Sequence, residues 1–437
     1  MGVCRRDGPP GRLYKFAGFG GLSNLAVVGR GHDLLLDCAG GVLTNKVAKI
    51  QTITETIRGK CMSTDEICFM SATDLAEKVR SRRLSAVEVV QAFLARIDRV
   101  NPSLNAYITV CAEQALAEAR KADERLFQAT KPAPLHGVPF SVKDLVYTAG
   151  VRTTSGSRIH EKHVPAVDAI SVSRLRAAGA ILLGKTNTPE FGYKATTENP
   201  LFGPTCNPWD LGKTPGGSSG GAAAATASGL SPLSVGTDGG GSIRIPASFC
   251  GVFGLKATYG LVPTLPGSGG WRTLSHTGPI TRAVRDAALM LDVMAGPHEL
   301  DRTSIPRDGT SYSAQLKPAR LNLRLGYSSN LGFAFLDDEV KAVVESALPT
   351  FERLGHTVEE VKIDLGPARD AFMAIVLAEN AAACGGYLEK QRALMDEGLV
   401  MFIEAGFGVT TLDYLAASRS RDTVAAELVS FFRGTTC

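Results

Sequence analysis

The sequence lacks any uninterrupted apolar run of the roughly 18 to 20 residues that a helix needs to span a bilayer, which argues against stable membrane insertion. It also lacks clustered cysteines, since the nine that it has are widely spaced and form no CxxC pair. This spacing excludes a zinc ribbon and indicates reduced thiols in a cytoplasmic protein. We therefore expect neither a metal site nor another cofactor.

Excess charge of one sign is missing from most of the chain. The net charge is +4, and residues 1–61 alone carry nine Lys and Arg against four Asp and Glu, so the remainder is close to neutral. A neutral body gives no general electrostatic attraction for phosphate, which argues against nucleic acid as a partner. The 44% of hydrophobic residues is ordinary for a globular protein.

Residues 1–61 show no sustained helical or strand period and are rich in glycine. Asp7, Gly8 and two prolines follow the first arginine pair, where a secretory signal would have its apolar core. We expect this segment to be an atypical, poorly ordered basic leader, with an Arg-rich transit segment as the alternative. The folded domain is expected to cover residues 62–437.

From residue 71 onward the periodicity is clear. Ser85 and Glu88 form a capping box that predicts the start of a helix, which is expected to end at Asn101–Pro102. Further elements are predicted as helices over 112–127, 169–179 and 337–354, and as strands over 137–142, 180–183, 321–327 and 356–363. Helices alternating with strands favour an α/β architecture.

Two short motifs match catalytic patterns only in their letters. Residues 179–186 read G-x-x-x-x-G-K-T, but the middle of this segment is an apolar strand rather than a bare phosphate-binding turn. Residues 216–220 read G-x-S-x-G, the nucleophile elbow of Ser-His hydrolases, but a Lys-Thr-Pro segment precedes them instead of a strand. The elbow remains an alternative, with Asp337 and the downstream histidines His276, His298 and His356 as its partners.

Glycine is concentrated in residues 201–270, which hold 17 of the 47 glycines. Within this window, residues 215–243 carry Asp238 as their one charged side chain and form two Ser/Gly turns, separated by an Ala-rich helix and a short strand. A flexible linker is the alternative reading. A serine here would need a base, and Lys143, which follows a buried strand, could supply a desolvated neutral amine. A salt-bridge role for this lysine is the alternative.

Three ordered segments, GVPFSVKD (137–144), TPGGSSGGAAA (214–224) and GTDGGGSIRIPASFCGVFGLKATYG (236–260), resemble the amidase signature family. The resemblance is dense over about 135–295, with the signature core at about 135–265. It implies a single α/β domain with a central mixed β-sheet covered by helices on both faces. It also implies a catalytic triad of Lys143 as base, Ser218 as a bridging serine after a cis peptide, and Ser242 as nucleophile. Further residues implied are the oxyanion donors Gly239, Gly240 and Gly241, and the supporting residues Ser219, Thr237, Asp238 and Arg244.

The function implied is hydrolysis of a small-molecule amide through an acyl-enzyme, without a cofactor. Two alternatives stay open: the A subunit of glutamyl-tRNA amidotransferase, and a catalytically impaired relative that only binds amides or partners. A homodimer is also left open. The chain departs from the family pattern by having glycine at position 239 and by stopping at Cys437, where family members usually continue, so we expect a domain truncated at its C-terminus.

Overall fold

The computed structural model describes residues 62–128, 132–267, 270–316 and 322–434, together with three strands near the N-terminus. The chain divides into two compact units, Met1–Met62 and Ser63–Cys437. In the first unit, the described strands form an antiparallel sheet in the order β1 (Leu13–Tyr14), β2 (Ala26–Arg30) and β3 (Asp33–Asp37). The prediction of a poorly ordered leader otherwise falls outside the described residues and stays a prediction.

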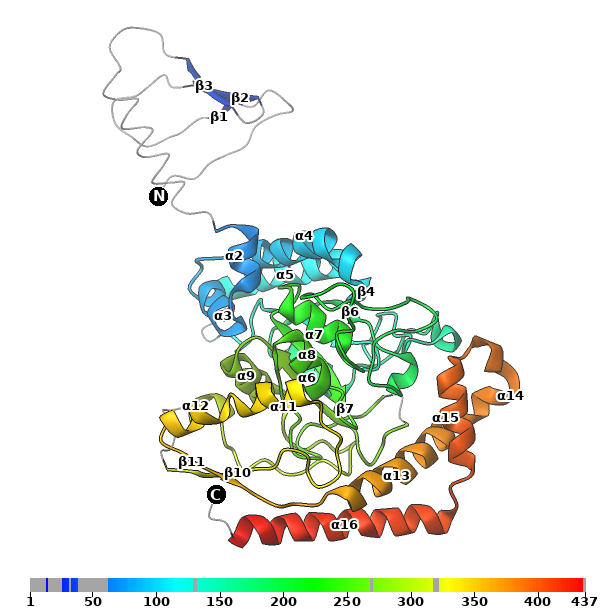
Figure 1. Ribbon diagram of the computed structural model, residues 1–437. Helices are drawn as coiled ribbons and strands as arrows, with labels where there is room; N and C mark the ends of the chain where they lie inside the picture. Colours follow the sequence, from blue (N-terminus) through cyan, green and yellow to red (C-terminus); the bar gives the residue numbers. More distant parts are fainter. Residues whose placement is uncertain are drawn as a thin grey trace. The chain divides into compact units, whose positions relative to one another are not determined.

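A six-stranded mixed sheet forms the centre of the second unit (Figure 1). Its order is β4 (Tyr107–Val110), β6 (Ile181–Thr186), β5 (Pro139–Lys143), β7 (Leu233–Asp238), β9 (His276–Thr281) and β8 (Phe253–Gly254). β5 runs parallel to β6 and β7, whereas β4, β9 and β8 pair antiparallel to their neighbours. The carboxyl ends of the three central strands therefore meet at one edge of the sheet.

Helices cover this sheet, because every residue of β5 and β6 is buried and both faces of these strands need packing partners. The helices of the amino-terminal half are α2 (Thr64–Phe69), α3 (Ala72–Arg80), α4 (Ala86–Leu104), α5 (Ala112–Gln128), α6 (Ile170–Ala177), α7 (Gly220–Ala227), α8 (Arg244–Cys250) and α9 (Val284–Met294). Among these, α4, α5, α7 and α9 contact the central strands. The fold is thus α/β with a mixed central sheet, as the sequence predicts.

The predicted start of α4 is confirmed and its predicted end is wrong. Ser85 and Glu88 make both hydrogen bonds of the capping box. The helix then continues through Pro102 to Leu104, and Asn105 ends it in the left-handed region. A proline in the last turn disturbs a helix little here, because the carbonyl that loses its partner, on exposed Asp98, can face water.

The carboxyl-terminal part adds a second, two-stranded parallel sheet of β10 (Arg324–Tyr327) and β11 (Thr357–Glu360). The single helix predicted over 337–354 is instead two, α11 (Asp338–Glu345) and α12 (Leu348–Arg353), with Pro349 in the first turn of the second. The other helices are α10 (Tyr312–Gln315), α13 (Gly366–Cys384), α14 (Leu388–Gln391), α15 (Glu397–Phe407) and α16 (Thr411–Gly434). Figure 1 shows α13 and α16 lying side by side, and α13 also packs against α15.

One helical stretch among the described residues, Gly366–Leu394, is long and apolar enough by composition to cross a membrane. The pair Glu397–Phe407 and Thr411–Arg433 passes the same test only as a single span bent by 97°. The argument against membrane insertion from the length of uninterrupted apolar runs therefore does not apply to these helices. Since α13 packs against both α15 and α16, part of this apolar surface has partners within the protein, and the lack of membrane insertion stays a prediction.

Candidate active site

Lys143 is the last residue of β5, at the edge of the sheet where the central parallel strands end. Its side chain is completely buried. The Nζ atom donates hydrogen bonds to Ser218 Oγ at 2.6 Å and to Thr237 Oγ1 at 2.9 Å. Within the described part of the chain no carboxylate forms an ion pair with this lysine, so the salt-bridge role that the sequence left open is not seen.

Burial lowers the pKa of Lys143 from 10.5 to about 7, because the charged ammonium loses its hydration while the neutral amine loses little. The negative charge of Asp238 opposes this shift and raises the pKa to a smaller extent. A pKa near neutrality gives the amine a large unprotonated fraction at physiological pH, which is the state that a general base requires.

Ser218 lies on the Gly-Ser turn that leads into α7, and the Gly217–Ser218 peptide bond is cis. Gly217 is required for steric reasons, since a Cβ at this position would lie 2.6 to 2.8 Å from three backbone atoms of Thr196. The turn therefore lies directly against a neighbouring backbone segment. Its close packing buries the Ser218 side chain beside Lys143.

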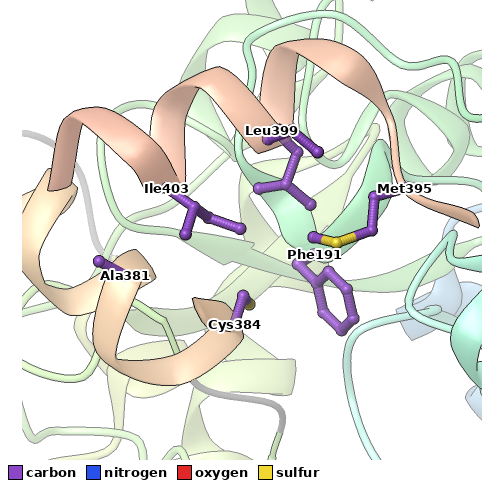
Figure 2. Close-up of a cluster of buried hydrophobic side chains, with 7 residues drawn as sticks. Phe191, Ala381, Cys384, Met395, Leu399 and Ile403 are labelled. Atoms are coloured by element: carbon purple, nitrogen blue, oxygen red, sulfur yellow. The ribbon is translucent and has the colours of Figure 1, made fainter. Parts of the chain in front are cut away.

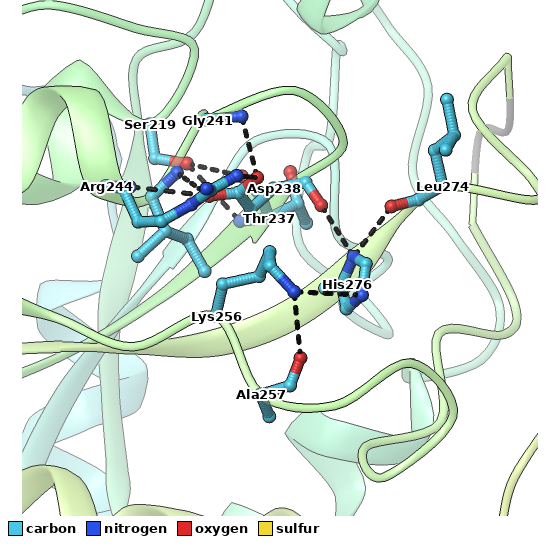
Figure 3. Close-up of polar contacts among 10 residues, drawn as sticks. Ser219, Thr237, Asp238, Gly241, Arg244, Lys256, Ala257, Leu274 and His276 are labelled. Atoms are coloured by element: carbon cyan, nitrogen blue, oxygen red, sulfur yellow. Dashed lines mark hydrogen bonds and ion pairs between the residues drawn. The ribbon is translucent and has the colours of Figure 1, made fainter. Parts of the chain in front are cut away.

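The loop that follows β7 carries Ser242 and is folded around the buried Asp238 carboxylate (Figure 3). That carboxylate accepts hydrogen bonds from the backbone N–H groups of Gly241 at 2.7 Å and Ile243 at 3.1 Å. It also pairs with the Arg244 guanidinium at 2.9 Å, which helps to lower the pKa of Asp238 against the opposing effect of burial. Asp238 therefore stays ionised and fixes the loop.

One hydrogen bond of this loop corrects a role implied by the family resemblance. Gly241 N–H is used by Asp238, so it is not free to bind an oxyanion in this structure. Ser219, on the turn before α7, supports the site through Thr237: its hydroxyl donates to Thr237 O at 3.1 Å and accepts from Thr237 N at 3.3 Å. Both residues thus hold backbone in place, and Thr237 supplies the second contact to the lysine.

A pocket of about 200 Å³ opens beside these residues. Ser218, Ser242, Thr237 and Gly239 line it together, although Ser218 lies on the turn before α7 and the other three lie at the end of β7 and in the loop after it. Ser219 N–H also donates to Ser242 O at 3.1 Å, which ties the turn to the loop. The remaining lining residues are Leu145, Val146, Phe191, Gly192, Thr264, Leu265, Pro266, Gly267, Trp271, Arg272, Ser275 and Thr277.

The model of the Amidase family matches residues 88–427, which is most of the chain. The chain belongs to the Amidase family. An acylamidase of Rhodococcus erythropolis is 42% identical over 354 residues, covering 80% of this chain and 74% of that protein. The A subunit of the glutamyl-tRNA(Gln) amidotransferase of Carboxydothermus hydrogenoformans is 43% identical over 298 residues, covering 68% of this chain and 61% of that protein.

Solved structures of this family are also similar. A bacterial aryl acylamidase superposes with a TM-score of 0.78 at 30% identity, covering 84% of this chain and 78% of the other. A 6-aminohexanoate cyclic dimer hydrolase superposes with a TM-score of 0.77 at 32% identity and the same coverage. The chain is thus an Amidase-family hydrolase, with relatives that act on amides.

In this Amidase-family fold, the two motifs that matched other catalytic patterns have different structural roles. Residues 181–186 form β6, and the buried Lys185 donates to Val146 O, Thr148 Oγ1 and Thr153 Oγ1, as expected for a strand rather than for a phosphate loop. The Ser218 hydroxyl of the G-x-S-x-G segment contacts a lysine and not a histidine.

Phe191 is a site residue that the sequence analysis did not identify. It lines the pocket on one side and packs on the other into a buried cluster with Met395, Leu399 and Ile403 (Figure 2). The helices α13 and α15 thereby support one wall of an Amidase-family pocket from a distant part of the sequence. Neither Phe191 nor the other aromatic wall residue, Trp271, could be identified from the sequence. An isolated aromatic residue gives no signal that distinguishes a pocket wall from a core position.

Proposed function

We propose that this protein hydrolyses carboxylic amides through an acyl-enzyme on Ser242, with Ser218 relaying protons between Ser242 and Lys143. The observation that carries the proposal is the 2.6 Å hydrogen bond between the fully buried Lys143 Nζ and Ser218 Oγ, next to a pocket that Ser242 also lines. A desolvated amine with a pKa of about 7 can accept a proton near neutral pH.

In the first half-reaction, neutral Lys143 takes the proton of Ser218 while Ser218 takes that of Ser242. The Ser242 oxygen attacks the amide carbonyl and forms a tetrahedral oxyanion. As the C–N bond breaks, the proton returns from the Lys143 ammonium through Ser218 to the leaving nitrogen, which departs as ammonia or an amine. Water then attacks the ester with the same relay, releases the carboxylic acid and restores Ser242.

The oxyanion is proposed to be bound by backbone N–H groups of the loop after β7. Among the described residues, the N–H groups of Gly239, Gly240 and Ser242 have no hydrogen-bond partner, whereas that of Gly241 is used by Asp238. Unpaired donors beside the nucleophile can stabilise the charge that develops in the transition state. The proposed oxyanion donors are therefore Gly239, Gly240 and Ser242.

The pocket favours an uncharged acyl group. Phe191, Leu145, Leu265 and Trp271 supply an apolar wall, and Arg272 is the one charged side chain among the described lining residues. Glutamine would bring both an α-carboxylate and an α-ammonium, and the ammonium would find no carboxylate partner in this lining. A neutral aliphatic or aryl amide fits this chemistry better than glutamine does.

A second candidate is the amidotransferase role, which the 43% identity to an amidotransferase component favours. In that role the protein would release ammonia from glutamine and pass it to a partner-bound tRNA. A homodimer and cytoplasmic localisation also stay predictions.

Labelling with a fluorophosphonate probe tests the proposed nucleophile, with peptide mass spectrometry to locate the adduct. We expect the adduct on Ser242, no adduct in Ser242→Ala, and strongly reduced labelling in Lys143→Ala. His356→Ala serves as the matched control for the elbow hypothesis and should label normally. Loss of labelling in His356→Ala alone would contradict the lysine mechanism, and a folded wild type that never labels would favour the binding role.

A substrate panel of benzamide, an anilide, hexanamide and glutamine separates the two enzymatic candidates. Hydrolysis of the neutral amides with little release of ammonia from glutamine supports the stand-alone hydrolase. Preferential release of ammonia from glutamine contradicts the argument from the pocket lining and favours the amidotransferase role.

A further inference from the structure

His276 lies at the start of β9, directly opposite Asp238 in the antiparallel pairing with β7. Its Nδ1 atom is 3.1 Å from the main-chain oxygen of Asp238 and 2.7 Å from that of Leu274 (Figure 3). On the other side of the ring, Nε2 is 3.4 Å from Lys256 Nζ. The imidazole thus lies between two carbonyl oxygens and one amine.

These neighbours determine which ring nitrogen carries the proton. Carbonyl oxygens only accept hydrogen bonds, so Nδ1 must carry a hydrogen and donate it. The Lys256 amino group donates to Nε2, so Nε2 carries none. Burial and the positive charge of Lys256 also lower the pKa of His276, which favours the neutral ring.

The orientation of the ring is fixed by its surroundings. Tyr259 packs edge-on against the imidazole with ring centroids 5.5 Å apart, and its hydroxyl donates to Arg272 O at 2.9 Å. Lys256 holds Nε2 from the opposite side to the carbonyls. A ring held in this way can act as a fixed donor to the Asp238 carbonyl.

The peptide that His276 holds is the one that precedes the proposed oxyanion donor Gly239. The Asp238–Gly239 bond is trans, and in a planar trans peptide the C=O and N–H bonds point in opposite directions. Fixing the carbonyl toward His276 therefore directs Gly239 N–H away from the imidazole. Gly239 lines the pocket, and its N–H has no partner in the part of the chain that the structure describes.

We infer that His276 is a positioning residue, which holds the Asp238 carbonyl so that Gly239 N–H is aimed at the oxyanion of the reaction proposed above. The Asp238 side chain holds the other end of the same loop through Gly241 and Ile243. The main-chain oxygen of Asp238 is thus held at the start of the loop, and the Asp238 carboxylate holds the end of the loop. This arrangement leaves Gly239 and Gly240 between them as the proposed donors.

Two amide substitutions of similar polarity test the inference. The His276→Asn side chain can place its NH2 group where Nδ1 lies and keep the hydrogen bond to the Asp238 carbonyl. The longer His276→Gln side chain places its amide where Nε2 lies, facing Lys256, and leaves that carbonyl without a donor. If the Gln variant does not fold, His276→Ser replaces it, because its short side chain also fails to reach the carbonyl.

We expect His276→Asn to keep kcat within about threefold of the wild type. His276→Gln should lower kcat about 10- to 100-fold with KM little changed, which is less than the roughly 100- to 1,000-fold cost of removing an oxyanion donor outright. A trifluoromethyl ketone analogue of the best neutral amide adds Ser242 at its carbonyl and forms an oxyanion. Its affinity for His276→Gln should be lower than for the wild type by the same factor as kcat. Thermal unfolding of each variant confirms that it is folded.

The inference is wrong if folded Asn and Gln variants have equal kcat, or if the Gln variant changes only KM. It is also wrong if the inhibitor binds both variants equally well. These results would leave the proposed hydrolase function intact, because the wild type would still be active. A wild type that neither hydrolyses amides nor binds the ketone would instead contradict the proposed function, and the role of His276 with it.

Discussion

Lys143 and Thr237 meet at the ends of two neighbouring parallel strands, β5 and β7, where the lysine Nζ donates a hydrogen bond to the threonine Oγ1 at 2.9 Å. The sheet register places the two side chains at the same edge. Since Ser218 accepts the other hydrogen bond of the amine, Thr237 would orient that amine in the proposed proton exchange with Ser218. The threonine hydroxyl is thus the fixed contact of the proposed base.

Replacing Thr237 by valine removes this acceptor and keeps the branched shape. The ammonium form of Lys143 loses more stabilisation than the neutral amine, so the pKa of the lysine falls further. We expect the midpoint of the kcat/KM profile to move to lower pH and the plateau kcat to fall about five- to tenfold. Thr237→Ser keeps the hydroxyl and should behave like the wild type; an unchanged Thr237→Val profile would contradict the role of this contact.

The pH dependence of activity should report the deprotonation of Lys143. Because burial lowers its pKa to about 7, the neutral base accumulates as the pH rises through 7. We expect kcat/KM for a neutral amide to increase from pH 5 to about pH 8 and then to level off. Lys143→Arg, which stays protonated over this range, should be inactive at every pH. A profile that falls between pH 6 and 8 would contradict a lysine base.

The Lys143 amine also affects the stability of the folded protein. The unfolded chain holds the Lys143 proton up to about pH 10.5, whereas the folded chain releases it at about 7, so between these values the unfolded state binds more protons. The contribution of this lysine to the free energy of unfolding therefore rises with pH, by up to about 1.4 kcal/mol per pH unit. Lys143→Met lacks this dependence.

Urea denaturation at several pH values measures the difference between wild type and Lys143→Met. The methionine variant should be more stable than the wild type at pH 7, and the difference should shrink as the pH is raised toward 10. Titration of other groups cancels in this comparison, since both proteins share them. A difference that is constant over this range would show that the Lys143 proton is not linked to folding.

The proposed catalytic residues could be chosen from the sequence because three short motifs resemble the amidase signature family, and the resemblance assigns a role to each position. Residues 215–243 carry one charged residue, and the serines stand out there against glycine and alanine. Local signals also predicted helix starts well, because a capping box such as Ser85 and Glu88 involves residues three positions apart. Helix ends are harder to predict: α4 continues through Pro102, whereas Pro349 lies in the first turn of a new helix.

The pocket wall and the positioning contacts could not be predicted in this way. Phe191 and Trp271 are ordinary apolar residues in the sequence, and only tertiary packing places them at the pocket. The sequence offers His276 as a partner of the elbow serine, but the pairing of β9 with β7 places it beside the Asp238 carbonyl. Such contacts depend on strand register between segments that are distant in the sequence, which local patterns do not specify.

Gly217 should not tolerate a side chain. A Cβ there would lie 2.6 to 2.8 Å from backbone atoms of Thr196, and backbone cannot move aside as a flexible side chain can. We expect Gly217→Ala to lose at least about 2 kcal/mol of stability and nearly all activity, because the shift displaces Ser218. Gly386→Ala is the matched control, since nothing lies within 4 Å of its added Cβ. Thermal unfolding and amide hydrolysis measure both effects.

Phe191 and Leu399 belong to the same buried cluster, but of the two only Phe191 lines the pocket. Truncating a buried Leu to Ala typically costs about 2 to 5 kcal/mol, and truncating Phe about 3 to 5 kcal/mol, so both variants should unfold at clearly lower urea concentration. Their kinetics should differ. Phe191→Ala removes an aromatic wall, and we expect its KM for an aryl amide to rise about tenfold.

Leu399→Ala should keep the wild-type KM at a temperature where it remains folded, because its side chain does not line the pocket. Steady-state kinetics on benzamide, with circular dichroism to confirm folding, separates the two effects. An equal rise of KM in both variants would mean that the cluster acts on the pocket through its stability alone. A rise confined to Phe191→Ala would show that Phe191 contacts the substrate directly, whereas Leu399 contributes to stability alone.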